Sequence, residues 1–233
     1  MEKQDVINAI KELREKSPKK NFKQSVDVLI NLKDIDLKKP EHNIDLYLQL
    51  PNPSHKKLKL GAFVDQQLGV QAKKLFDTIV LKEDFSKWVN NKKDQKKLAS
   101  SYDFFVAQVE LMPQIATTFG KVFGARGKMP NPKAGCVVAG TSNLEPLVNK
   151  LKDTIRIKTR NETSIKLVIG GEEVSDDKLT DNILFIYNNV LSKLPQEKQN
   201  IRYIGIKYTM GPLIKIKEET KASEKKAKRM KNA

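Results

Sequence analysis

The hydrophobic pattern differs between the two ends of the chain and its middle. Apolar and polar residues alternate in residues 21–32 and 46–50, and again in 155–160, 164–170 and 202–209. Such alternation is typical of antiparallel strands that have one buried and one solvated face. In the middle, strand-like and helix-like segments alternate, which is typical of a parallel sheet covered by helices on both faces. These two patterns predict an α/β protein of two domains, one inserted in the other.

The change of pattern also predicts where the domains begin and end. We expect residues 1–57 and 154–217 to form a discontinuous α+β domain, with helices on one face of an antiparallel sheet. Residues 58–153 should form the inserted domain, a three-layer Rossmann-like α/β fold that includes one long lysine-rich helix over residues 83–100. Residues 218–233 contain many lysines and almost no apolar residues, so we expect a basic disordered tail.

The composition limits the kinds of partner and cofactor. The chain has 44 lysine and arginine residues against 28 acidic ones, a net charge of +16, which favours a polyanionic partner. Cys136 is the only cysteine and there are two histidines, too few for a disulfide or a usual zinc site, so we expect no cofactor. No apolar run approaches the roughly 20 residues that span a bilayer, and the N-terminus lacks a signal-peptide core. We expect a cytoplasmic protein without a membrane partner.

Residues 202–217 read R-Y-I-G-I-K-Y-T-M-G-P-L-I-K-I-K and combine a strand pattern with an abrupt break. The alternation ends at Met210-Gly211-Pro212, where the most flexible residue precedes the stiffest one, so we expect a defined bend. Such a bend should leave the Thr209 hydroxyl and the Gly211 backbone unused by the sheet. The stretch alone favours a turn between strands over a binding site.

Polar side chains oppose the apolar face of the predicted strands in the terminal domain. Cations on such a surface can contact phosphates and hydroxyls can contact sugars, as in a surface that positions a nucleic-acid backbone. A sheet that is merely open to water has the same polarity, so both interpretations stand. Phe22, which lies among polar neighbours, favours binding, although its ring can also fill a gap in the core. The positions on this surface are Ser25, Asp27, Lys158, Arg160, Lys166, Lys207 and Thr209.

The glycine-rich stretch G-A-R-G-K-M-P-N-P-K-A-G, residues 124–135, is a second candidate site. Its backbone amides, with Arg126, Lys128 and Lys133, form a set that can hold a phosphate. The stretch matches neither the Walker A pattern nor the dinucleotide fingerprint, however. A rigid structural loop explains it equally well.

A small nucleotide-dependent α/β enzyme is the alternative of another functional class. The first strand–helix junction of the inserted domain, F-V-D-Q-Q-L-G-V, lacks the glycines that let a backbone approach pyrophosphate. Asp65 and Asp103 follow predicted strands, but neither has an evident partner base or metal set. Acidic residues in such places are more often helix caps, so we expect no catalytic residues.

Four motifs together resemble the large-subunit ribosomal protein L-one family, called L-ten-a in eukaryotic cytosolic ribosomes, and the chain is most similar to archaeal members. They are N-F-K-Q-S-V-D (21–27), Y-D-F-F-V-A-Q-V-E-L-M-P (102–113), G-A-R-G-K-M-P-N-P-K-A-G (124–135) and K-Y-T-M-G-P (207–212). The resemblance extends from the first helix to about Lys217. Ala125 and Cys136 depart from it, where proline and a small hydroxyl residue are expected, and both departures lie in the inserted domain.

The resemblance implies a non-enzymatic protein of the large ribosomal subunit. Its terminal domain would bind large-subunit rRNA, form the mobile stalk near the tRNA exit site and assist release of deacylated tRNA. It implies a second role as a repressor of its own mRNA, and a monomer off the ribosome. A dedicated mRNA regulator that never enters the ribosome is a further alternative.

The resemblance also implies which residues contact RNA. The aromatic contact corresponds to Phe22, and basic positions of intervening strands correspond less directly to Lys158, Arg160 and Lys166. A secondary RNA contact would involve Arg126, Lys128 and Lys133. The remaining implied contacts are Gln24, Ser25, Asp27, Thr209, Met210, Gly211 and Pro212.

Overall fold

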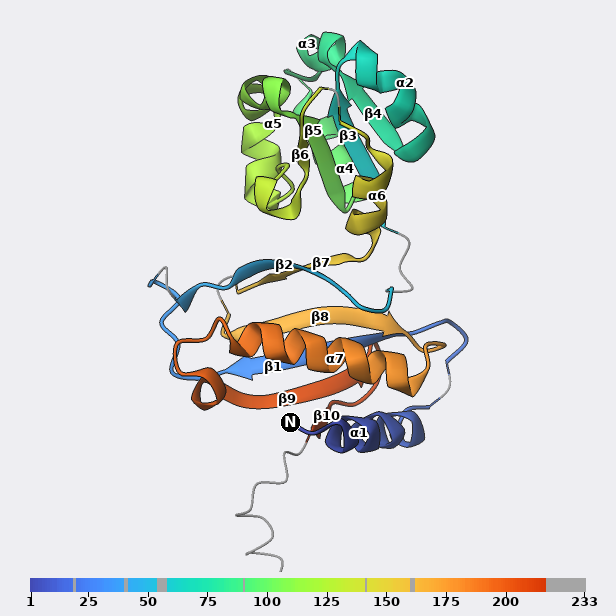
Figure 1. The fold of residues 1–233 in the computed structure, drawn as a ribbon, viewed down its shortest axis with the longest axis vertical. Coiled ribbons are helices and arrows are strands. Elements are labelled where there is room, and N and C mark those ends of the chain that lie inside the picture. The colour runs from blue at the N-terminus through green and yellow to red at the C-terminus, as the bar shows by residue number, and fades with distance from the viewer. Residues whose placement is uncertain are drawn as a thin grey trace, which may run out of the picture. The chain divides into compact units, whose positions relative to one another are not determined.

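The computed structural model describes residues 1–18, 20–39, 42–53, 58–89, 91–140, 142–159 and 162–216 (Figure 1). Arg160 and the predicted tail lie outside these described residues. The chain divides into two compact units. Unit 1 consists of the described residues of Met1–Lys56 and Ile155–Ala233, and unit 2 of those of Lys57–Thr154. No helix among the described residues has the length and apolar character needed to cross a membrane.

Unit 1 is built on a four-stranded antiparallel sheet with the order β10-β9-β1-β8. The central strand β1 places Val28 opposite Leu167 on one side and opposite Ile206 on the other. Segments from the two ends of the sequence therefore pair directly in the middle of this sheet. The strands are β1 (Ser25–Leu32), β8 (Ser164–Gly171), β9 (Ile201–Tyr208) and β10 (Ile214–Ile216).

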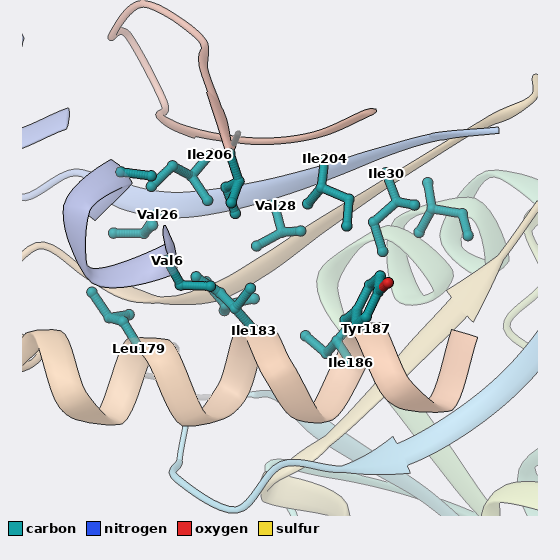
Figure 2. Close-up of a cluster of buried hydrophobic side chains, with 14 of the residues drawn as sticks. Val6, Val26, Val28, Ile30, Leu179, Ile183, Ile186, Tyr187, Ile204 and Ile206 are labelled. Carbon is teal, nitrogen blue, oxygen red and sulfur yellow. The ribbon is translucent and has the colours of Figure 1, made fainter. Parts of the chain in front are cut away.

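Two helices, α1 (Lys3–Lys16) and α7 (Asp176–Leu191), pack on the apolar face of this sheet. Figure 2 shows Val6 and Ile183 from the helices against Val28 and Ile206 from the strands. All four side chains are at most 1% exposed. Burial of each such aliphatic side chain contributes roughly 1.5–3 kcal/mol. The predicted alternation of the terminal strands is confirmed by this core.

The start of α7 is held by a long-range arginine contact and not by a serine cap. Ser175 occupies the N-cap position, but its hydroxyl makes no capping hydrogen bond. Arg14 of α1 instead donates to Asp176 Oδ1 over 2.9 Å and to the Val174 carbonyl over 3.0 Å. These bonds fasten the C-terminal part of α1 to the segment that leads into α7.

The strands β2 (Asp45–Gln49) and β7 (Thr154–Lys158) form a separate two-stranded sheet. The prediction that all the terminal strands share one sheet surface is therefore wrong for β7. Arg156 clamps this pair, because its Nε and Nη2 donate to the two carboxylate oxygens of Asp45 over 2.9 and 2.8 Å. This bond raises the pKa of the Arg156 guanidinium. The guanidinium also lies 5.1 Å from the centre of the Tyr47 ring.

Unit 2 contains a four-stranded parallel sheet with the order β4-β3-β5-β6. Its strands are β3 (Leu60–Val64), β4 (Thr78–Leu81), β5 (Phe104–Gln108) and β6 (Val137–Val138). An aromatic cluster on one face joins Phe63 and Phe105 of the strands to Phe119 and Phe123 of α5 (Met112–Arg126). Helices cover both faces, with α2 (Gln66–Leu75) and α6 (Glu145–Lys152) on the face opposite α5 (Figure 1). The predicted α/β fold with an antiparallel and a parallel sheet is confirmed.

The helices of unit 2 differ from prediction in one place. The long helix predicted over residues 83–100 is instead a 3-10 turn, Lys82–Asp84, followed by the separate helices α3 and α4. Asn91 starts α4, because its side chain accepts a hydrogen bond from the Asp94 amide over 3.3 Å. An asparagine cap competes with helix continuation at this point. The helices are α2 (Gln66–Leu75), α3 (Phe85–Val89), α4 (Lys92–Ser101), α5 (Met112–Arg126) and α6 (Glu145–Lys152), and further 3-10 turns are Val109–Leu111, Pro132–Ala134 and, in unit 1, Glu197–Asn200.

Candidate nucleic-acid interface

The bend after β9 is a tight turn with little free space. The Gly211 amide donates to the Tyr208 carbonyl over 2.9 Å, which closes the turn. A Cβ atom at Gly211 would lie 3.1 Å from both Ser17 Oγ and Tyr208 Cβ, closer than most real Cβ contacts. The Gly211 amide, which the sequence predicted to be unused by the sheet, is used by the turn itself. The close approach of Ser17 and Tyr208 favours glycine here, because a larger residue would have to displace one of them.

Thr209 joins this turn to the beginning of β1. Its amide donates to the Ser25 carbonyl over 3.1 Å, and its Oγ1 lies 3.3 Å from both the Ser25 amide and the Ser25 carbonyl. The sequence predicted only that the sheet leaves the Thr209 hydroxyl unused, and the structure adds that Ser25 occupies it. Residues 184 positions apart in the sequence are thus fixed to each other.

Gln24 holds Met210, the next residue of the turn, through a hydrogen bond. Its side chain is only 3% exposed, and its Oε1 accepts a hydrogen bond from the Met210 amide over 3.3 Å. Its own carbonyl accepts from the Glu172 amide over 2.9 Å. A buried amide with these partners supports the shape of the turn, and it presents little surface to a partner molecule.

Two apolar side chains project into solvent from this hydrogen-bonded frame. Phe22 is 52% exposed and Met210 is 67% exposed. Large apolar groups that a rigid backbone keeps in water are typical of interaction sites. Pro212 is exposed in the same turn. We call this set the corner surface, and it comprises Phe22, Gln24, Ser25, Thr209, Met210, Gly211 and Pro212.

The polar face of the large sheet continues from the corner surface. Asp27 of β1 lies opposite Lys207 of β9 and opposite Val168 of β8. Partial burial raises the pKa of the Asp27 carboxyl, and the charge of Lys207 opposes that shift. Lys166 of β8 is exposed, lies opposite Leu29, and forms an ion pair of 2.6 Å with Glu162. Asp27, Lys166 and Lys207 thus share one face, as predicted.

Two residues on this face were not recognised from the sequence. Lys215 of β10 places its Nζ 4.9 Å from the centre of the Tyr203 ring on β9. The alternation of β9 puts Tyr203 on the same side as Lys207, so a signal for it was present. The register of β10 opposite β9 brings Lys215 there, and a three-residue strand carries too little pattern to predict its register.

The other predicted cations of the terminal domain lie elsewhere. Lys158 is on β7 of the two-stranded sheet, and its Nζ is 3.9 Å from Asp45 Oδ2. Its polar outward position was predicted correctly, but pairing with β2 removes it from the β1–β9 sheet. Arg160 lies outside the described residues.

The glycine-rich stretch of unit 2 begins in the last turn of α5 and continues as a loop, and its three cations have different surroundings. Gly127 and Gly135 have positive φ angles of 65° and 73°, which glycine adopts readily. Lys128 Nζ donates to the Asp103 carbonyl over 2.9 Å, and Arg126 Nη1 donates to Ser100 Oγ. Lys133 is exposed on the 3-10 turn Pro132–Ala134. The three cations therefore make different contacts within unit 2.

The acidic residues considered for catalysis have structural partners. Asp65 caps α2 by accepting from the Gln66 amide over 2.8 Å. Asp103 accepts from the Lys59 amide over 3.2 Å and so joins two strand starts. Among the described residues, no three His, Cys, Asp or Glu side chains are grouped to hold a metal ion.

Fold and site together define an α/β protein with an inserted unit, whose most distinctive surface is a rigid, partly apolar corner. The chain belongs to the Ribosomal protein L1p/L10e family, whose model matches residues 13–212. It is accordingly a structural ribosomal protein and not an enzyme.

Relatives from several archaea cover almost the whole chain. Large ribosomal subunit protein uL1 of Methanothermobacter thermautotrophicus is 36% identical over 214 residues, which are 91% of this chain and 99% of the relative. The protein of the same name from Pyrococcus abyssi is 37% identical over 217 residues, 93% of this chain and 97% of its own. That from Methanocaldococcus jannaschii is 36% identical over 225 residues, 97% and 100% of the two chains. The predicted resemblance to archaeal members is confirmed.

Proposed function

We propose that this constituent of the large ribosomal subunit binds large-subunit rRNA through the corner surface and the adjoining sheet face. The observation that carries the proposal is the exposure of Phe22 and Met210, at 52% and 67%. Gln24 and Thr209 fix the backbone beneath them through bonds that link the two ends of the sequence. A surface organised before binding loses little conformational freedom when RNA arrives.

The side chains of the corner surface match the chemistry of unpaired or distorted RNA. The Phe22 ring offers a platform for a base, and such stacking contributes about 1–3 kcal/mol per base. Met210 adds an adaptable apolar contact for a base or sugar. The Thr209 hydroxyl precedes Met210 in the same turn, and it can exchange its weak internal bond to Ser25 for a bond to a 2′-hydroxyl.

The cations around the corner surface supply attraction to phosphates. Lys207, Lys166 and Lys215 lie on the open sheet face, and Lys23 lies between Phe22 and Gln24. Lys166 and Lys23 form exposed ion pairs with Glu162 and Glu173 at 2.6 and 2.7 Å. Exposed pairs of this kind contribute little stability, so a phosphate can replace the carboxylate at small cost.

The finer parts of the proposed function follow from the family resemblance. With its rRNA segment, the protein forms the mobile stalk near the tRNA exit site and assists release of deacylated tRNA. It also represses translation of its own mRNA through a site that mimics the rRNA one, and it is a monomer off the ribosome. Residues 1–57 with 154–217 act as the RNA-binding domain and residues 58–153 as the inserted domain.

Replacement of Met210 tests the site most directly. Met210→Asp puts a negative charge where RNA would lie, and we expect tight binding to large-subunit rRNA to be lost. Val70→Asp in α2 is a matched control, since Val70 is 70% exposed and the acid is introduced in unit 2. Filter binding at fixed salt, in the presence of excess tRNA, measures both variants. Unchanged affinity of Met210→Asp would contradict the proposed site.

Two milder substitutions separate the stacking contact from the frame. Phe22→Ala should weaken rRNA binding about 5- to 150-fold, the equivalent of one stacked base, while the melting temperature stays the same. Thr209→Val removes the hydroxyl that contacts Ser25, so it should reduce affinity and local order together. If Thr209→Val lost affinity and Phe22→Ala did not, the corner surface would contribute through its backbone conformation and not through stacking on Phe22.

Sedimentation distinguishes a ribosomal constituent that also represses mRNA from a regulator that never enters the ribosome. We expect the protein in cell extracts to sediment with large subunits and to remain there after a moderate salt wash. The rRNA segment should also compete with the mRNA leader for the purified protein. A protein found only in ribosome-free fractions would contradict the ribosomal role, even if RNA binding were strong.

A further inference from the structure

The exposed side of α4 presents four lysines in a compact group. Lys92, Lys93, Lys96 and Lys97 are all exposed and are spaced so that two pairs are one helical turn apart. In an α-helix, residues four apart lie side by side about 6 Å along the axis. The four ammonium groups therefore follow one surface of unit 2. We call this set the lysine ridge.

The lysine ridge is unfavourable for the helix that contains it. Lys92 and Lys93 lie in the first turn, where the helix dipole disfavours cations by about 0.3–1 kcal/mol each. Like charges four residues apart add a further penalty of roughly 0.2–0.5 kcal/mol per pair. Lys97 has a carboxylate, Asp94, at 3.6 Å, whereas the other three have no acidic partner at ion-pair distance among the described residues. An arrangement with this local cost calls for a partner that compensates it.

The body of the helix is firmly attached to its neighbours. Gln95 is buried and its Nε2 donates to the Trp88 carbonyl over 2.6 Å and to the Thr118 carbonyl over 3.2 Å. At the other end of the helix, Arg126 of α5 donates to Ser100 Oγ and adds a fifth cation beside the ridge. The ridge is thus a fixed surface on a folded unit.

We propose that the lysine ridge, with Arg126, binds the sugar-phosphate backbone of RNA as a second contact, located in unit 2. This contact reads no base sequence, because the ridge offers ammonium groups and no aromatic platform. It goes beyond the proposed function, which concerns the corner surface and the adjoining sheet face of unit 1. It also gives Arg126 a role other than a phosphate cradle in the glycine-rich loop.

The chemistry of the ridge favours RNA over other polyanions. A helix that binds a membrane surface inserts an apolar face, but the apolar residues of α4, Leu98 and Ala99, are buried in unit 2. Protein–protein interfaces are enriched in aromatic residues and depleted in lysine at their centres, and the ridge has the opposite composition. Lysines and hydroxyl groups are the usual contacts to phosphates, which repeat regularly along a nucleic-acid strand.

The test compares two full-length variants that lose the same charge from unit 2. The ridge variant carries Lys92→Gln, Lys93→Gln, Lys96→Gln and Lys97→Gln, which keep helix propensity nearly constant. The control carries Lys73→Gln, Lys74→Gln, Lys150→Gln and Lys152→Gln, exposed positions in the last turns of α2 and α6. Both are made in the natural chain and in the Met210→Asp chain. The probe is a mixed-sequence single-stranded RNA of about 40 nucleotides, titrated at several salt concentrations.

We expect the ridge variant to bind the probe at least about tenfold more weakly at low salt, and the control less than about twofold more weakly. The slope of log K against log salt should decrease by about 0.7 for each phosphate that the variant no longer neutralises. Stability should move in opposite directions: the ridge variant melts at a slightly higher temperature, because unfavourable dipole and like-charge terms are removed. The control melts slightly lower, because its helix C-termini no longer carry these cations.

Three outcomes would overturn the proposal. Equal weakening in the two variants would mean that only net charge matters, and unchanged binding by the ridge variant would exclude the contact. The natural chain could also bind poly-glutamate, or vesicles that contain phosphatidylserine, as tightly as it binds the RNA probe. If the ridge variant then lost as much affinity for them as for RNA, the ridge would be assigned to another partner. Each comparison is repeated in the Met210→Asp chain, so the two proposals can fail separately. If the corner surface does not bind rRNA, Met210→Asp alone will bind large-subunit rRNA as tightly as the natural chain.

Discussion

The two units differ in how many faces of their main sheet are covered by helices. In unit 1, α1 and α7 cover one face, and the other face keeps Asp27, Lys166 and Lys207 at the surface. In unit 2, helices cover both faces of a parallel sheet. An open sheet can bind through its strands, whereas a covered sheet can bind only through its helices and loops. The two proposed RNA contacts follow this division, one on strands and a turn, the other on a helix.

The cores differ as the surfaces do. Unit 1 is packed chiefly with aliphatic side chains, as Figure 2 shows for Val28, Ile183 and Ile206. Unit 2 is packed around Phe63, whose ring centre is 5.0 Å from that of Phe119 and 5.5 Å from that of Phe105. The two hydrophobic clusters share no residue. A substitution in one core should therefore leave the surface of the other unit functional.

Phe63→Ala gives the largest expected effect and tests this independence. Phe63 is fully buried, and its removal should destabilise unit 2 by about 3–5 kcal/mol. Trp88, the single tryptophan, lies against Phe119 with 5.9 Å between ring centres, so its fluorescence reports unit 2. Denaturant should shift the tryptophan signal of the variant to lower concentrations, while rRNA binding at the corner surface persists. Parallel loss of fluorescence and corner binding would show that the units unfold together.

Cys136 allows a second test, of how completely the covered sheet excludes water. Burial raises the pKa of this thiol from 9.0 to about 11, and a hydrogen bond from the Asn131 backbone opposes the shift. The folded protein therefore holds the proton more tightly than the unfolded one. Its stability should fall as the pH rises from about 9 to about 11, by roughly 2–3 kcal/mol in total. Unfolding free energies of the natural chain and of Cys136→Ala across this range measure the difference.

The pH dependence, and not the absolute stability, is the quantity to compare, since Cys136→Ala also leaves a small cavity. A thiol reagent provides a control at neutral pH: the native thiol should react only when unit 2 opens. Fast reaction in the absence of denaturant would mean that water reaches Cys136 and that the covered sheet is more open than its geometry indicates.

Substitutions of one glycine in each unit should change the free energy of unfolding by a smaller amount and in opposite directions. Gly211→Val should destabilise unit 1 by about 1–3 kcal/mol, because the side chain meets Ser17 and Tyr208 at 3.1 Å. Gly124→Ala in α5 should instead stabilise unit 2 by about 0.5–1 kcal/mol, since no atom lies within 4 Å of the added Cβ. Thermal unfolding measures both. Stabilisation by Gly211→Val would contradict the close packing of the corner surface.

The sequence predicted those features that depend on local periodicity. Alternation identified Val26, Val28 and Ile30 as one buried face, because side chains in a strand alternate whatever its partners are. Phe22 stood out as an aromatic residue among polar neighbours, and Met210 marked the point where the alternation ends. The alternation of strand-like and helix-like segments predicted the parallel sheet of unit 2, because parallel neighbours are joined by helices.

The features that the sequence did not predict depend on long-range pairing. Nothing in the pattern of β7 indicates that it pairs with β2, so Lys158 was assigned to the larger sheet. Gln24 resembles a surface residue until the Met210 amide is brought to its Oε1. The Thr209 hydroxyl also resembles a free group until Ser25 lies beside it. Local pattern thus located the strands and the bend, the family resemblance indicated the candidate site, and tertiary contacts decided which of its groups remain available.

Asp27 gives the smallest expected effect and compares an acid on the open sheet with the buried thiol of unit 2. Partial burial raises the pKa of Asp27 above its ordinary value of 3.8, and Lys207 opposes the shift. The ionised carboxylate therefore costs stability at neutral pH, and this cost disappears as the pH falls through the raised pKa. Asp27→Asn should be slightly more stable than the natural chain at pH 7, and the gain should shrink towards pH 4.

Lys207→Gln is the matched variant, and its effect should have the opposite sign. Without the cation, the ionised Asp27 loses its compensating charge, so the chain should be less stable at pH 7 and closer to the natural one at pH 4. Urea unfolding at the two pH values measures all three proteins. If Asp27→Asn proved less stable at pH 7, Coulombic attraction to Lys207 would outweigh desolvation. Asp27 and Lys207 would then form a stabilising pair on the open face, and Lys207 would exchange Asp27 for an RNA phosphate less readily.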